Sequence, residues 1–232
     1  MPPQPLRLVI DRWGEPTPRK IAEAVEVLNR GGVAAYPTDS IYALGCAIES
    51  RDGIERIYRA KHMGKGQRLA LICPDLSTAA EYGIFSQTAF RLAQRIFPGP
   101  YTLVVPATRE VPRTLTDNKR RTVGIRVTSH PIAQALAKAL GRPLLTSSAI
   151  APETGEPCRD ADEILEAFGA AIDVVIDSEQ TPASPSTVLA VDGEEITLLR
   201  AGEGSLEGII DDASIEAVSA TTTATARHDR RR

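Results

Sequence analysis

Hydroxyl and carboxylate side chains follow a short apolar run near the start of the chain. The run from Val33 to Tyr36 has the length of a buried strand, and Thr38, Asp39 and Ser40 come just after it. In open α/β sheets, ligands bind beyond the carboxyl ends of the strands. The pattern therefore predicts a site where these three side chains meet a ligand, with a polar turn between two strands as the alternative.

Positive charge gathers in two segments of the chain. One segment contains Arg51, Arg56, Arg59, Lys61, Lys65 and Arg68, and the other runs from Arg109 to Arg126. If both segments face the same side of a sheet, they form a trough that attracts a triphosphate or a nucleic-acid backbone, despite a net charge of −3. The alternative is that these residues cover the solvated faces of a helix and a loop.

A second group of hydroxyls, Thr146, Ser147 and Ser148, stands at the end of another strand-like run, where it can bind phosphate oxygens or close a turn. Gly64-Lys65-Gly66 resembles part of a phosphate loop but lacks the spacing of a Walker motif. The sequence contains no GxGxxG after a strand and no HExxH, CxxC or GxSxG. The sequence therefore does not favour an NAD-dependent enzyme, a zinc enzyme or an esterase.

Length and composition indicate one large soluble domain. The chain has 232 residues, and no apolar run approaches the roughly 18 residues of a membrane span. The N-terminal stretch lacks the apolar core of a signal peptide. The chain has three cysteines, Cys46, Cys73 and Cys158. Their odd number and wide spacing suit a reducing compartment. We therefore expect a cytoplasmic protein.

Strand-like and helix-like patterns alternate along the chain. Strands are expected at residues 6–10, 33–36, 69–72, 101–105, 122–127, 144–146 and 172–176, and a hairpin at residues 188–199. Helices are expected after the capping residues Thr17, Ser86, Ser129 and Asp160, and around Ile54 to Tyr58. The alternation predicts one α/β domain over residues 1–218, with a twisted mixed sheet flanked by helices. We expect residues 219–232, which are small and polar and then basic, to form a disordered tail.

Six segments carry a family resemblance. They are YPTDSIYALGC from Tyr36, PGPYTLVVPA from Pro98, RTVGIRV from Arg121, PLLTSSA from Pro143, PSTVL from Pro185 and LLRAGEG from Leu198. Their order is that of the YrdC/YciO family, and the chain most resembles the YciO branch. The resemblance implies a YrdC-like single domain with a concave basic face that binds nucleotide and, in some members, double-stranded RNA or tRNA.

The activity that this resemblance implies is threonylcarbamoyl-AMP synthesis. L-threonine and bicarbonate form a carbamate, which attacks the α-phosphorus of ATP with Mg²⁺ assisting, and pyrophosphate leaves. The product supplies the threonylcarbamoyl group of threonylcarbamoyladenosine in tRNA. Such a reaction needs positioning and charge neutralisation from the protein more than covalent chemistry.

The resemblance also implies roles for individual residues. Threonine would be held by Thr38 and Arg126, next to Tyr42 and Ser186, and the nucleotide by Lys61, Thr102, Ser148 and Arg200. Arg126 suits a bidentate contact with a carboxylate. Thr102 and Tyr42 fit equally well as residues kept for folding. No protein ligand for a metal is identified, so Mg²⁺ would arrive with ATP.

The sequence departs from the synthase pattern at three positions. Met63 and Ile150 replace the arginine of a KxR motif and the asparagine of an SxN motif, and Ile72 replaces a histidine. Lys65 or Arg68 would have to compensate for the missing guanidinium. The chain is therefore either a synthase with reduced activity or a YciO-like protein that binds nucleotide, tRNA or double-stranded RNA without turnover. A reaction on another adenylate or a hydrolysis is a third reading.

Overall fold

The computed structural model describes residues 4–10, 15–64, 69–116 and 121–209. Lys65, Arg68 and the expected tail therefore lie outside the described residues. The helices are α1 (Pro18–Asn29), α2 (Arg51–Ala60), α3 (Leu76–Tyr82), α4 (Gln87–Ile96), α5 (Pro131–Leu140) and α6 (Ala161–Phe168), with a short 3₁₀ turn at Arg113–Leu115. Within the described ranges, no helix is long and apolar enough to cross a membrane.

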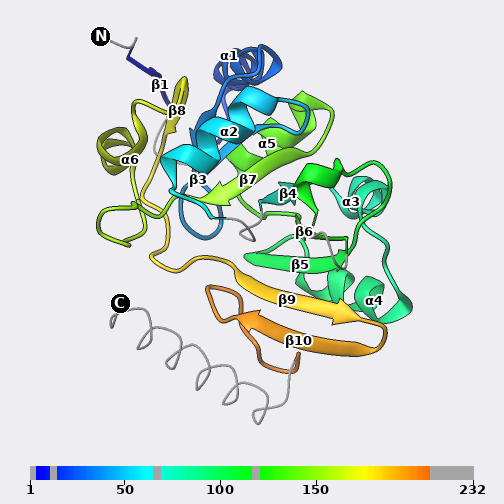
Figure 1. Ribbon diagram of the computed structural model, residues 1–232. Coiled ribbons are helices and arrows are strands. Elements are labelled where there is room, and N and C mark those ends of the chain that lie inside the picture. The colour runs from blue at the N-terminus through cyan, green and yellow to red at the C-terminus, as the bar shows by residue number, and fades with distance from the viewer. Residues whose placement is uncertain (1–3, 11–14, 65–68, 117–120, 210–232) are drawn as a thin grey trace.

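Ten strands form one sheet in the order β1-β8-β2-β3-β7-β4-β6-β5-β9-β10 (Figure 1). They are β1 (Leu6–Val9), β2 (Ala34–Tyr36), β3 (Ala43–Ala47), β4 (Ala70–Ile72), β5 (Tyr101–Pro106), β6 (Thr122–Arg126), β7 (Leu144–Ser148), β8 (Val174–Asp177), β9 (Thr187–Asp192) and β10 (Glu195–Arg200). The sheet is mixed, because it contains parallel pairs such as β2 with β8 and antiparallel pairs such as β3 with β7. The predicted α/β fold with a mixed sheet is confirmed.

Helices cover both faces of the sheet. Leu144 and Leu145 are neighbours in β7, yet they lie in two different hydrophobic cores, because successive side chains of a strand point to opposite faces. Leu144 packs in the core that includes Leu136 of α5 and Leu28 of α1. Leu145 packs in the larger core that includes Ile57 of α2.

Helix starts follow the predicted caps with one exception. Ser86 Oγ accepts a hydrogen bond from the backbone N–H of Ala89 and caps α4, as expected. For α5 the expected cap Ser129 is wrong, because His130 occupies the cap position and its Nδ1 accepts from the N–H of Ile132. Pro131 is the reason: proline prefers the first helical position, so the cap must be the residue just before it.

Candidate functional site

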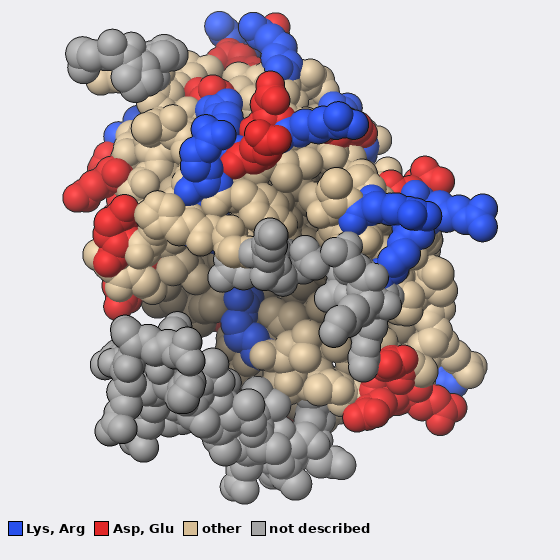
Figure 2. All heavy atoms as spheres, viewed as in Figure 1, with Lys and Arg blue, Asp and Glu red and all other residues tan. Residues whose placement is uncertain are grey.

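A cavity of about 650 Å³ opens on one face of the sheet over β7, β4, β6, β5 and β9. Its floor follows the strand register. Ala70 pairs with Thr146 on one side and with Gly124 on the other, and Thr102 pairs with Val188. All five residues line the cavity. Figure 2 shows the hollow, with Lys or Arg side chains inside it.

Small residues keep the floor of the cavity open. A Cβ atom on Gly124 would lie 3.1 Å from Thr102 Cγ2 and 3.3 Å from Ala70 Cβ. Such contacts are tighter than ordinary van der Waals packing, so a larger residue at position 124 would push on both neighbours and fill the hollow. The alternation of small and hydroxyl side chains along these strands thus creates space for a ligand.

Three cations line this cavity: Lys61, Arg126 and Arg200. Among the described lining residues there is no Asp or Glu. Hydroxyl groups of Ser147, Ser148 and other residues complete the polar part of the wall. A hollow with cations, hydroxyls and no described carboxylate at its surface attracts anions.

Lys61 follows the last turn of α2, and the end of that helix directs it. His62 has the left-handed φ of 50°, its N–H donates to Arg59 O, and the N–H of Met63 donates to Tyr58 O. These two bonds form a Schellman motif, which usually places glycine where His62 stands. Lys61 Nζ then donates to Ser147 Oγ and to Ser148 O, both at 2.5 Å.

Burial changes the acidity of Lys61. The pKa of its ammonium group falls from 10.5 to about 8, because burial penalises the charged form and the Arg200 guanidinium adds repulsion. The pKa of Arg200 is also lowered, first by burial and then by the charge of Arg126. The three cations therefore act on one another across the cavity, and an anion placed between them relieves that repulsion.

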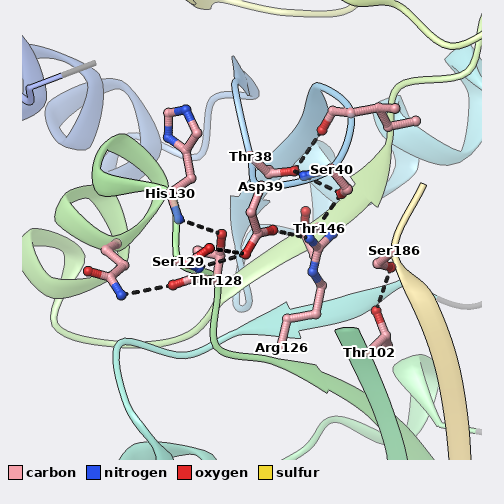
Figure 3. Close-up of polar contacts among 12 residues, drawn as sticks. Thr38, Asp39, Ser40, Thr102, Arg126, Thr128, Ser129, His130, Thr146 and Ser186 are labelled. Atoms are coloured by element: carbon pink, nitrogen blue, oxygen red, sulfur yellow. Dashed lines mark hydrogen bonds and ion pairs between the residues drawn. The ribbon is translucent and has the colours of Figure 1, made fainter. Parts of the chain in front are cut away.

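Arg126 ends β6 and is almost fully buried. Its Nη2 donates to Asp39 Oδ1 at 2.9 Å and to Ser40 Oγ at 3.1 Å (Figure 3). The two charged side chains are only 4% and 8% exposed. Arg126 Nε is buried and has no hydrogen-bond partner within the described parts of the chain. A buried, charged donor of this kind is costly unless a ligand completes its contacts.

The residues after β2 support Arg126 instead of lining the cavity. Asp39 Oδ2 accepts from the N–H of Ser129 at 2.6 Å and from its Oγ at 3.0 Å. Thr38 Oγ1 donates to Ile41 O at 2.7 Å and accepts from the N–H of Ser40. The segment thus forms a polar turn between β2 and β3 that holds the guanidinium of Arg126 from one side. The contact of these three side chains with a ligand stays a prediction.

Arg200, Ser186 and Thr102 form a second unit on the wall. Arg200 donates through Nε and Nη2 to Ser186 O at 3.1 and 2.8 Å, and through Nη2 to Ser186 Oγ at 3.1 Å. Ser186 Oγ lies 2.9 Å from Thr102 Oγ1. Like Lys61 and Ser148, these residues carry predicted roles in ligand binding, and the structure brings all five to one cavity.

Tyr42 lies elsewhere, in the hydrophobic core. It is fully buried, its hydroxyl donates to Ile176 O at 3.1 Å, and the N–H of Ser178 donates to that hydroxyl at 3.3 Å. Burial raises the pKa of the phenol. Tyr42 is not among the residues that line the cavity, and neither is Thr38. Their roles toward threonine stay predictions.

The departures from the synthase pattern divide into two kinds. Met63 and Ile150 both line the cavity, so apolar side chains stand on its wall at the two positions where the family resemblance implies an arginine and an asparagine. Ile72 is buried in the core under α1 and α5 and does not reach the cavity. The first two replacements bear on ligand binding, whereas the third bears on packing.

The two basic segments contribute few of their cations to this cavity. Arg56 forms two hydrogen bonds to Asp173, at 2.8 and 3.0 Å, and Arg51 and Arg59 are exposed. Figure 2 shows cations and acids interleaved over the region of α1 and α2. Among the described members of the two segments, Lys61 and Arg126 line the cavity. The remaining described cations of α2 fit the solvated-face alternative better than a continuous trough.

The residues of the cavity do not form a metal site of their own. In the described ranges, no group of three or more His, Cys, Asp or Glu side chains could hold an ion. Asp39, the carboxylate next to Arg126, is fully engaged with Arg126 and Ser129. A magnesium ion at this site would have to depend on the ligand's own oxygen atoms.

Comparison with known proteins gives a consistent assignment. The Sua5, YciO and YrdC family model, described as telomere recombination, matches residues 26–202. The Uncharacterized protein YciO of Escherichia coli K12 is 40% identical over 192 residues, which cover 83% of this chain and 93% of the relative. The threonylcarbamoyl-AMP synthase of Shigella boydii is 37% identical over 173 residues, which cover 72% and 89%.

Solved structures agree with these relatives. The crystal structure of E. coli YciO has a TM-score of 0.82 at 38% identity and covers 88% of this chain and 98% of that one. P. abyssi Sua5, crystallised in complex with L-threonine, has a TM-score of 0.79 at 28% identity and covers 88% and 59%. The chain belongs to the Sua5, YciO and YrdC family.

Proposed function

We propose that this protein is a threonylcarbamoyl-AMP synthase-type nucleotidyltransferase, which joins L-threonine, bicarbonate and ATP and serves the threonylcarbamoyladenosine modification of tRNA. The observation that carries the proposal is the cavity itself. The buried Arg126, the half-buried Lys61 and Arg200, and several hydroxyls line it. The described lining contains no carboxylate, and Arg126 Nε is buried without a partner in the described part of the chain. A triphosphate and an amino acid carboxylate are the anions that such a site accommodates.

The arrangement suggests which group meets which ligand. Lys61 and Arg200 bind the phosphates of ATP, since neither has a salt-bridge partner in the described part of the chain. Arg126 receives the carboxylate of threonine through the donors that Asp39 and Ser40 leave free. The hydroxyls of Ser148 and Ser186 supply further contacts in the same cavity.

The chemistry follows from this placement. The amine of threonine and bicarbonate give a carbamate and water. A carbamate oxygen attacks the α-phosphorus of ATP, the bond to the bridging oxygen breaks, and pyrophosphate leaves. Lys61 and Arg200 neutralise the charge of the phosphates, while Arg126 fixes the amino acid. Magnesium enters only as the counterion that ATP brings.

The relatives support this proposal at a coarser level. Several relatives are named threonylcarbamoyl-AMP synthases, and the Sua5 structure contains L-threonine. Met63 and Ile150 line the cavity, so the site lacks the arginine and the asparagine that the resemblance to the synthases implies at these positions. Each missing charge-assisted hydrogen bond is worth about 1.5–3 kcal/mol, so turnover should be slower than in those enzymes.

The same two residues favour a second candidate function. With Met63 and Ile150 in the wall, the cavity would hold a nucleotide, or the protein would bind tRNA or double-stranded RNA, without turnover. The resemblance of the chain to YciO is consistent with this candidate. Strong salt dependence of RNA affinity, without consumption of ATP, would select it.

Pyrophosphate release distinguishes the two candidates. Purified protein is incubated with ATP, magnesium, bicarbonate and L-threonine, and the products are examined by mass spectrometry for threonylcarbamoyl-AMP. Omission of threonine is the control for ATP hydrolysis, and a threonylcarbamoyl-AMP synthase from the family is the positive control. Threonine-dependent release with the expected product supports the synthase. Its absence from a folded protein that binds ATP supports the second candidate.

A further inference from the structure

Asp39 is placed to control what Arg126 binds. We propose that Asp39 is a specificity-determining positioning residue: it neutralises and aims Arg126, so that this end of the cavity accepts a singly charged carboxylate and rejects phosphate. The role goes beyond the assignment of Arg126 to threonine and rests on the proposed function, because it presumes a site for an amino acid next to a nucleotide. It reverses the expectation that the carboxylate of Asp39 itself meets a ligand.

Both carboxylate oxygens of Asp39 are already engaged, and Asp39 does not line the cavity. Its Oδ1 accepts from Arg126 Nη2 at 2.9 Å, and its Oδ2 accepts from both the N–H and the Oγ of Ser129 at 2.6 and 3.0 Å. Ser40 Oγ holds the same Nη2 at 3.1 Å. With Nη2 fixed at one end, the guanidinium plane is oriented, and the buried Nε stays available.

The distribution of charge separates the cavity into two parts. At one part, the negative charge of Asp39 compensates the positive charge of Arg126, and both side chains are buried. At the other part, the partners of Lys61 and Arg200 in the described part of the chain are neutral oxygens of Ser147, Ser148 and Ser186. A multiply charged phosphate is therefore attracted to Lys61 and Arg200, whereas at Arg126 it also meets the repulsion of Asp39.

Removal of the Asp39 charge should consequently change the preference of Arg126 between carboxylate and phosphate, and not merely lower the affinity for both. With Asp39→Asn, Arg126 becomes an uncompensated buried cation, and its attraction for phosphate rises. At the separations inside this cavity, one extra unit charge is expected to tighten phosphate binding by about tenfold or more. A residue with a purely structural role would lose binding of every ligand on substitution, so a gain of affinity separates the two explanations.

The experiment compares four proteins by titration calorimetry with inorganic phosphate, pyrophosphate and L-threonine as probes. They are the wild type, Asp39→Asn, Asp39→Glu and Asp177→Asn. Asp177→Asn is the matched control, because it removes one negative charge from a salt bridge with Arg7 that lies outside the cavity. Circular dichroism confirms that each variant is folded.

We expect Asp39→Asn to bind phosphate at least about tenfold more tightly and threonine more weakly than the wild type. Asp39→Glu keeps the charge and displaces it, so it should lose threonine affinity without the gain in phosphate affinity. Asp177→Asn should match the wild type with all three probes. An unchanged phosphate affinity in folded Asp39→Asn, or an equal gain in Asp177→Asn, would overturn the role of Asp39.

Two further results keep the test conclusive. If Asp39→Asn does not fold, Ser129→Ala serves, because it removes one hydrogen bond to Asp39 and leaves the backbone N–H in place. Ser129→Ala should weaken threonine binding several-fold and leave pyrophosphate binding unchanged. Equal threonine affinities of Ser129→Ala and the wild type would overturn the positioning role of Asp39. Failure of the wild type to bind pyrophosphate would instead contradict the proposed function, which separates the two failures.

Discussion

Replacement of Lys61 by methionine should raise the free energy of unfolding of the protein and lower the affinity of the cavity for anions. Lys61→Met keeps a long side chain and removes a buried charge. Lys61 currently donates to Ser147 Oγ and Ser148 O while its pKa is held at about 8. The variant therefore separates the stability of the fold from the affinity for anions, which commonly oppose each other at binding sites.

The magnitude follows from the pKa of Lys61. A fall from 10.5 to about 8, caused by burial and by repulsion from Arg200, corresponds to a cost of roughly 3 kcal/mol for the charged form at 1.36 kcal/mol per pKa unit. Methionine removes that cost and also two hydrogen bonds worth about 0.5–1.5 kcal/mol each. The net gain at pH 7 should be about 1–2 kcal/mol in the free energy of unfolding. Loss of a charged contact should weaken pyrophosphate binding by about 10–150-fold.

The pH dependence has a definite sign. Between pH 8 and 10.5 the unfolded chain keeps the Lys61 proton and the folded protein releases it, so the stability of the wild type rises with pH in this window. The stability advantage of Lys61→Met is therefore full below pH 8 and disappears toward pH 10.5. Pyrophosphate affinity changes the other way, because the wild type loses the Lys61 charge above pH 8.

Urea denaturation and titration calorimetry from pH 6.5 to 9.5 measure both effects on the two proteins. The ratio of their pyrophosphate affinities cancels the titration of the ligand itself. We expect that ratio to be largest below pH 8 and to shrink above it. Equal affinities at pH 7 would refute contact between Lys61 and phosphate. A ratio that does not change with pH would refute the lowered pKa.

Three other variants test separate parts of the account. His62→Gly should stabilise the fold by about 1 kcal/mol in urea denaturation, because His62 has a φ of 50° that glycine adopts without strain; a loss of stability would contradict the helix-end geometry. Arg126→Ala should cost about 3–5 kcal/mol of stability in thermal denaturation by leaving Asp39 buried and unpaired. It should also end threonine-dependent pyrophosphate release, and unchanged turnover would exclude Arg126 from the threonine site. Met63→Arg combined with Ile150→Asn should tighten pyrophosphate binding at least about tenfold in calorimetry; no gain would show that neither position meets phosphate.

Much of the fold could be predicted because local signals agree with it. The stripe Ile21, Ala24, Val25 and Leu28 is buried in α1, as its spacing indicates. The hairpin predicted at Asp192-Gly193 forms between β9 and β10, with its turn one residue later at Gly193 and Glu194 and with Gly193 at a φ of 63°. Residues close in the sequence determine these elements, so local patterns are enough to predict them.

Other elements depend on distant partners and escaped prediction. The sequence Ala43–Ala47 has no β-branched residue, yet it is a strand because β2 and β7 pair with it on both sides. The short helix α3 was also not predicted, although Asp75 caps it. Its seven residues are too few to give a clear periodic pattern.

The candidate site shows the same division. Lys61, Arg126 and Arg200 come from three distant parts of the chain, and motif order alone indicated that they share a site. Ala70 and Gly124 form the floor through strand register, which no local signal reveals. Compositional reasoning could not have selected these two residues, because small residues in strands are usually a matter of packing.

The most direct test of the central claim is to follow bicarbonate labelled with heavy carbon into product. Protein, ATP, magnesium, L-threonine and labelled bicarbonate are incubated, and the adenylates are analysed by mass spectrometry. Our account predicts an adenylate that carries the label and forms only when threonine is present. Absence of this labelled product, from protein shown by calorimetry to bind both pyrophosphate and threonine, would contradict the proposed synthase.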